Sequence, residues 1–224
     1  MGSAVSSISS FFTEEEYFNH MVQADADLSE SQPAVLPGNI SVRSVVSGTV
    51  CGIGSLLVVY TTTWILISHR VSEQFEGAVP TWTGVAWYVY NAHFIGLEST
   101  DGFGPFEADA TTNLLALSVA FETDVLFVLP PVLLLIAGAV GCLALGRNTL
   151  VRDRLHVGFS LTAVYTGTMI FGLFFTEYHV EGVVFGIEGV SETVSPDPVR
   201  GILITIIYPL LFATTGSYVV GEFR

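Results

Sequence analysis

Three histidines of this chain stand beside the ends of apolar segments, where they could bind a metal ion: His69, His93 and His179. Glu177 lies two residues before His179. Imidazole nitrogens and carboxylate oxygens are ligand types found in zinc and copper sites. The spacing fits no established ligand pattern, so we name His93, Glu177 and His179 as metal candidates. Histidines that are satisfied by ordinary hydrogen bonds are the simpler alternative.

Other chemistry is weakly signalled. The chain has no lysine, which excludes a retinal Schiff base and a phosphate-binding loop lysine. Cys51 and Cys142 both lie in apolar segments and form no C-x-x-C pair, so we expect them to act as small hydrophobic residues. We name no catalytic residue and expect no bound cofactor.

The elements that would position these residues are four apolar segments without Asp, Glu, Lys or Arg. They are Val45–Ile67, Val125–Leu145, Val157–Phe175 and Gly201–Val220. A helix needs roughly 20 such residues to cross a bilayer core of about 30 Å. We therefore predict an all-α membrane protein, a four-helix transmembrane bundle. The absence of ionised residues from the spans disfavours proton-coupled or ion-coupled transport.

The charge balance indicates the environment. The chain carries 21 acidic residues against seven arginines, for a formal net charge of −14. Molar salt shortens the Debye length to about 3 Å, and a densely acidic surface is then tolerated and stays hydrated. This composition favours an extreme halophile, and it argues against nucleic acid as a partner.

Arginines indicate the orientation in the cell membrane. Arg147, Arg152 and Arg154 lie in the short connection between the second and third spans, which should therefore be cytoplasmic. Both termini are then cytoplasmic as well. The connections 68–124 and 176–200 are external loops.

We divide the chain into an acidic N-terminal arm, 1–41, and a membrane domain, 42–224. The arm contains a capping box at Thr13–Glu16, which predicts a short amphipathic helix to about Gln23. That helix could pack on the membrane domain or dock a partner.

A small aromatic-rich extracellular cap is expected from the external loops. The stretch Val85–Leu97 is apolar but too short to span comfortably, and its tryptophans and tyrosines suit the headgroup zone. We expect an interfacial or re-entrant helix there, with a short fifth span as the alternative. A helix is expected through Leu114–Phe121, and Val180–Val194 predicts a β-hairpin.

Small residues and prolines mark the spans. Gly48 and Gly52 in the first span, and Gly138 and Gly141 in the second, allow close helix approach, either inside the chain or between copies of it. The pair Pro130 and Pro131 predicts a kink in the second span.

The segment Trp87-x-x-Tyr90-Asn91-Ala92-His93-Phe94, with the acidic lysine-free composition and the four spans, resembles a group of uncharacterised haloarchaeal multi-pass membrane proteins. The resemblance implies a habitat and a topology, and no activity.

For function, we expect a structural or accessory role in a larger membrane assembly rather than an enzyme. Its partners would be the lipid bilayer and further copies of the chain or other membrane subunits. Two alternatives stay open: a small-solute channel or transporter gated at the proline kink, and an externally facing metal-dependent enzyme.

Overall fold

The computed structural model describes residues 35–36, 40–99, 111–116, 121–146, 150–184 and 187–222. Four long helices dominate it: α2 (Val42–Gln74), α4 (Phe121–Leu143), α5 (Val151–Phe175) and α6 (Pro198–Glu222). All four are long and apolar enough to cross a membrane, which confirms a multi-pass membrane protein with four candidate spans. The expected helix 13–23 lies outside the described residues.

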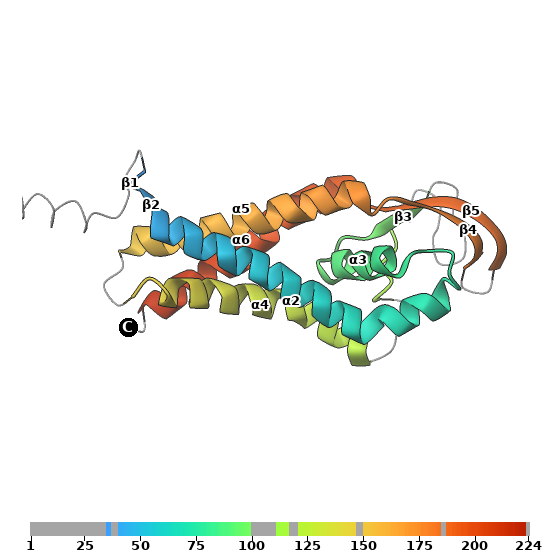
Figure 1. Ribbon diagram of the computed structural model, residues 1–224, viewed down its shortest axis with the longest axis horizontal. Coiled ribbons are helices and arrows are strands. Elements are labelled where there is room, and N and C mark those ends of the chain that lie inside the picture. The colour runs from blue at the N-terminus through green and yellow to red at the C-terminus, as the bar shows by residue number, and fades with distance from the viewer. Residues whose placement is uncertain are drawn as a thin grey trace, which may run out of the picture.

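The four helices form a bundle in which α6 packs on α4 and α5, and α2 packs on α5 and α4 (Figure 1). With 33 residues, α2 is about 50 Å long, so it extends well beyond a bilayer core of about 30 Å. Two short strands, β1 (Val35–Leu36) and β2 (Ile40–Ser41), pair just before α2 begins.

Glycines bring these helices into backbone contact. A Cβ atom added at Gly48 would lie 2.0 Å from Oγ of Ser160 and 2.4 Å from the carbonyl oxygen of Val157, both on α5. At Gly138 of α4 it would lie 2.2 Å from the carbonyl oxygen of Ala213 on α6. Atoms cannot approach this closely, so glycine is required at these positions.

Two further glycine contacts were not expected from the sequence. A Cβ at Gly216 of α6 would lie 2.1 Å from the carbonyl oxygen of Leu135, and one at Gly158 of α5 would lie 2.8 Å from Cα of Thr214. The contacts join α4, α5 and α6, so each of the four helices uses at least one glycine to approach a neighbour.

A smaller set of elements covers one end of the bundle, opposite β1, β2 and the end of α6 (Figure 1). It contains α3 (Thr81–Ala92), β3 (Leu97–Ser99), β4 (Tyr178–Val184), β5 (Ile187–Pro196) and residues 111–116, and we call it the end module. The strands form an antiparallel sheet in the order β3-β5-β4. The predicted hairpin is confirmed, and the chain is mostly helical rather than all-α.

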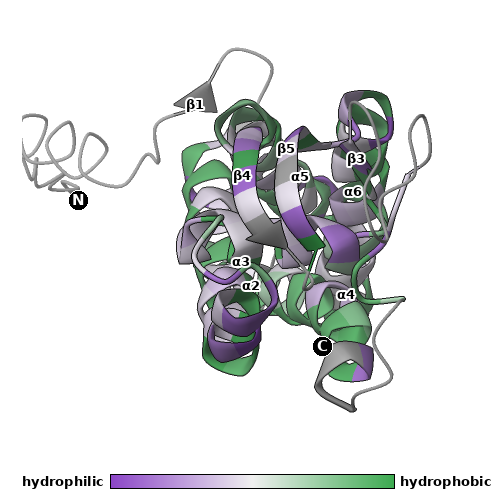
Figure 2. Ribbon diagram, turned by 90° about the vertical axis from the view of Figure 1, so that its right-hand side faces the viewer, coloured by the Kyte–Doolittle hydropathy of each residue, from purple (hydrophilic) through white to green (hydrophobic). Residues whose placement is uncertain are grey.

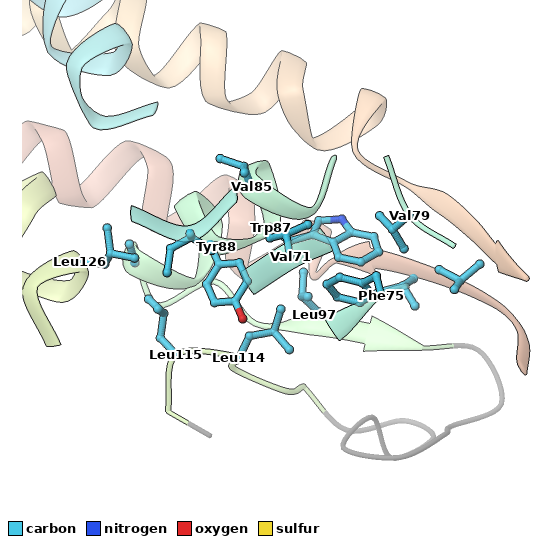
Figure 3. Close-up of a cluster of buried hydrophobic side chains, with 14 residues drawn as sticks. Val71, Phe75, Val79, Val85, Trp87, Tyr88, Leu97, Leu114, Leu115 and Leu126 are labelled. Carbon is cyan, nitrogen blue, oxygen red and sulfur yellow. The ribbon is translucent and has the colours of Figure 1, made fainter. Parts of the chain in front are cut away.

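The end module is more polar than the helices behind it. Figure 2 views this end of the molecule and shows hydrophilic residues on β4 and β5 in front of largely hydrophobic helices. Its interior is nevertheless an apolar core, shown in Figure 3, that joins α2, α3, β3 and the start of α4.

The predicted helix through Leu114–Phe121 is wrong over its first three residues. Leu114–Ala116 form a turn, and Thr112 pairs with Leu97 of β3. The side-chain oxygen of Asn113 accepts hydrogen bonds from the backbone of Leu115 and Ala116, which favours a turn over a continuing helix. Residues 117–120 lie outside the described part of the chain, and α4 is described from Phe121.

Candidate functional site

The helix α3 is the most deeply enclosed element of the end module. Every residue from Thr83 to His93 is buried, and Trp87 and Tyr88 have no exposed surface (Figure 3). Of the two tryptophans of α3, only Trp82 is exposed, at 47%. With 12 residues, α3 is about 18 Å long and too short to form a fifth span.

The aromatic rings of α3, expected at the headgroup level, have hydrogen-bond partners inside the protein, and their depth in the membrane stays a prediction. Nε1 of Trp87 donates to the carbonyl of Thr176 at 2.8 Å, and the hydroxyl of Tyr88 donates to the side chain of Gln74 at 2.7 Å. The hydroxyl of Tyr90 donates to the carbonyl of Met169 at 2.8 Å. Each polar tip is thus satisfied inside the protein rather than by water.

Glycine again makes room for one of these contacts. A Cβ atom at Gly172 of α5 would lie 2.4 Å from the hydroxyl oxygen of Tyr90. Tyr90 can therefore reach the backbone of α5 only because position 172 has no side chain.

Asn91 organises the exit from α3. Its Nδ2 donates to the carbonyl of Ile95 at 2.9 Å, and its Oδ1 accepts a hydrogen bond from the backbone of Leu114. Phe94 then adopts a positive φ of 63° and stacks on Phe127 of α4 at a centroid distance of 5.3 Å. The left-handed residue turns the chain back out of the bundle into β3.

His93 lies at the innermost point of this turn and has no exposed surface. Its Nδ1 is 2.7 Å from the carbonyl oxygen of Val89, and its Nε2 is 2.7 Å from the hydroxyl of Tyr165. A carbonyl can only accept, so Nδ1 carries a proton and donates to Val89. Burial lowers the pKa of His93 to about 4, so the ring is neutral near pH 7 and Nε2 accepts from the hydroxyl of Tyr165.

A third ring completes this buried polar cluster. Tyr208 of α6 meets His93 edge to face at 5.3 Å. The buried hydroxyl of Tyr208 has no hydrogen-bond partner among the described residues, and neither has that of Thr162. In the cluster of His93, Tyr165 and Tyr208, both imidazole nitrogens thus have hydrogen-bond partners, whereas the hydroxyl of Tyr208 has none among the described residues.

Comparison with known proteins identifies the kind of chain that carries this geometry. The model of a family of unknown function, DUF7978, matches residues 30–224. The chain belongs to this family. The match covers all four long helices and the whole end module. No curated protein and no solved structure matches the chain.

The histidines that this DUF7978 chain offered as metal candidates have separate surroundings. His93 uses both ring nitrogens inside the bundle, whereas His179 is exposed on β4, with Nδ1 3.2 Å from the hydroxyl of Thr193 and Nε2 3.3 Å from Glu181. Glu177 is exposed just before β4. Within the described ranges, no three His, Cys, Asp or Glu side chains are grouped to hold a metal ion.

The remaining predicted positions lie within the spans. The helix α4 continues through Pro130 and Pro131, and the kink stays a prediction. Gly141 lies beside Cys51: a Cβ atom added at Gly141 would lie 3.4 Å from Sγ of Cys51. Gly52 lies against Leu161 of α5.

Proposed function

We propose that this DUF7978 protein is a cell-membrane protein with a structural or accessory role in a larger membrane assembly. The observation that carries the proposal is the closed interior of the bundle. Fully buried apolar side chains from all four helices meet in one core, which α3 also joins: Val59, Leu134, Leu161, Tyr165 and Ala213.

A channel or transporter would need a polar path along the bundle axis. Here the side chains of Trp87, Tyr88, Tyr90 and Asn91 on α3 hydrogen bond to the protein. His93 reaches Tyr165, ten residues before the end of α5. At 1.5 Å per residue, α3 therefore fills about 15 Å of the open end. Because α3 occupies this end of the bundle, a scaffold role is favoured over a path for solutes.

The proposed orientation places the end module outside the cell and both termini in the cytoplasm. Arg152 and Arg154 begin α5 at the opposite end from the sheet, and the positive-inside tendency supports cytoplasm there. We further propose a halophilic archaeal host, on the net charge of −14. Lipid and other membrane subunits or copies, but not nucleic acid, are the proposed partners.

Flux measurements test the proposal against transport. The purified protein would be reconstituted in vesicles at molar salt, and uptake of sodium, chloride and glycerol compared with that of protein-free vesicles. We expect equal rates. Flux above the protein-free level, abolished by closing the route with a Tyr208→Trp variant, would replace the scaffold with a channel.

A second experiment tests the accessory role. The tagged chain would be extracted from host membranes in mild detergent and its size compared with that of the recombinant protein. We expect a larger particle that contains other membrane subunits in stoichiometric amounts. A particle of the same size as the recombinant protein would contradict the accessory role. Stoichiometric zinc or copper, lost in His93→Ala, would instead favour the metal-dependent enzyme.

A further inference from the structure

An apolar groove opens sideways from the bundle where α2 and α5 diverge and α3 lies between them (Figure 1). Its volume is about 270 Å³. The walls are Leu56 and Leu57 of α2 and Met169 and Phe175 of α5, and the floor is Ala86 and Val89 of α3. The groove therefore exists because α3 holds the two spans apart.

The chemistry of the groove is uniform. The hydroxyls that line it have partners in the protein: that of Tyr60 donates to the carbonyl of Trp82, that of Tyr90 to Met169, and that of Thr168 to Val164. The walls between these groups are apolar side chains that offer a polar ligand no hydrogen bond. A hydrocarbon occupant would give up no hydrogen bonds when it contacts these walls.

The surroundings determine what reaches the opening. The groove walls on α2 and α5 lie within the charge-free segments Val45–Ile67 and Val157–Phe175. On the rim of the groove, Leu57 and Phe175 are each 59% exposed. Side chains of this kind on a spanning helix face lipid, so the opening faces hydrocarbon tails.

The size of the groove selects among apolar occupants. The volume of about 270 Å³ is several times the roughly 30 Å³ that one water molecule takes in the liquid. A single turn of protein helix, about 5.4 Å long and about 10–12 Å across with its side chains, would need more than this volume. A stretch of a single lipid tail needs less room and is wholly apolar.

We propose that the groove between α2, α3 and α5 holds the hydrocarbon tail of one membrane lipid. This inference rests on the membrane location and not on the accessory role. The bound tail fills the space that the separated spans leave beside α3, and it completes the packing of the end module against the bundle.

Trp82 provides the reporter, because it lines the groove and is exposed, whereas Trp87 is buried. In a Trp64→Phe background, the delipidated protein in detergent would be titrated with a phospholipid that carries brominated tails, which quench indole emission on contact. We expect quenching that saturates near one lipid per protein. Quenching that rises without saturation would show only general contact with lipid and would overturn the proposal.

Two substitutions on α5 form a matched pair. Thr168→Phe places a ring in the groove, and Ala163→Phe places the same ring on an exposed site of the same helix outside it. We expect Thr168→Phe to lose the saturable quenching and Ala163→Phe to keep it, with both melting near the wild-type temperature. Equal quenching in the two variants would place the lipid elsewhere and refute the site.

Discussion

At the scale of single residues, His93 has the most constrained environment in the described part of the chain. It is fully buried, donates to Val89 and accepts from Tyr165. Protonation of Nε2 would give the imidazole a second donor, facing a hydroxyl that now donates to it. It would also bury a charge that faces no carboxylate in the described part of the chain. The folded state is therefore most stable with His93 in its neutral form.

This environment predicts a pH dependence of stability. The pKa of His93 is about 4 in the folded protein, below the ordinary value of about 6.5, so the unfolded state binds the extra proton first as pH falls. The contribution of His93 to the free energy of unfolding is fully present above about pH 6.5. It is lost as the pH falls from about 6.5 to about 4, by about 3 kcal/mol over that range. Unfolding measured across this range in detergent checks it.

The control for this prediction is His93→Phe, in which carboxylates still titrate but the imidazole is gone. The variant should be less stable at pH 7, since the hydroxyl of Tyr165 loses its acceptor at a cost of roughly 1–3 kcal/mol. Its decline below pH 6.5 should be shallower than that of the wild type. Parallel pH curves for the two proteins would contradict the assignment.

At the scale of helices, the bundle depends on where glycines face backbone. Gly138 meets the carbonyl of Ala213, whereas nothing lies within 4 Å of a Cβ atom at Gly167. Both are glycines of membrane-spanning helices, yet only the first mediates a helix contact. The difference lies in the neighbouring helix and not in the glycine.

Gly138→Ala should therefore separate α4 from α6 and lower stability by about 1–3 kcal/mol, the usual cost of overpacking. Gly167→Ala should leave stability unchanged or raise it slightly, since alanine is the better helix former. Thermal melts of the two variants in one detergent decide the matter. The prediction fails if the two alanines have the same effect.

At the scale of the whole molecule, the end module and the start of α5 lie at opposite ends of the bundle. Single cysteines at Ser191 of β5 and Val151 of α5 report on the two ends, and both positions are exposed. In a background without Cys51 and Cys142, an impermeant maleimide should label position 191 in intact cells and position 151 only after lysis. Labelling of position 151 in intact cells would reverse the proposed orientation.

Net charge also acts at this scale. With a formal charge of −14, repulsion between carboxylates should destabilise the solubilised protein as salt falls from molar to about 0.1 M, where the Debye length grows from about 3 Å to about 10 Å. The melting temperature should fall steadily over that range. A melting temperature that stays constant would remove the argument for a halophilic host.

The four spans and the hairpin can be predicted from the sequence, because both depend on local patterns. A charge-free run of about 20 residues predicts a membrane helix whatever its neighbours are. The β-branched, glycine-punctuated stretch 180–194 predicts its own pairing. Overall acidity and the absence of lysine are likewise properties of composition alone.

The position of α3 and the partners of its side chains cannot be predicted from local patterns, because they depend on long-range packing. Trp87 and Tyr90 look like interfacial residues when read alone, but their partners Thr176 and Met169 are 89 and 79 positions away. His93 likewise meets Tyr165 across 72 positions. No local pattern encodes such distances, because the partners come together only when α2, α5 and α6 have packed around the short helix.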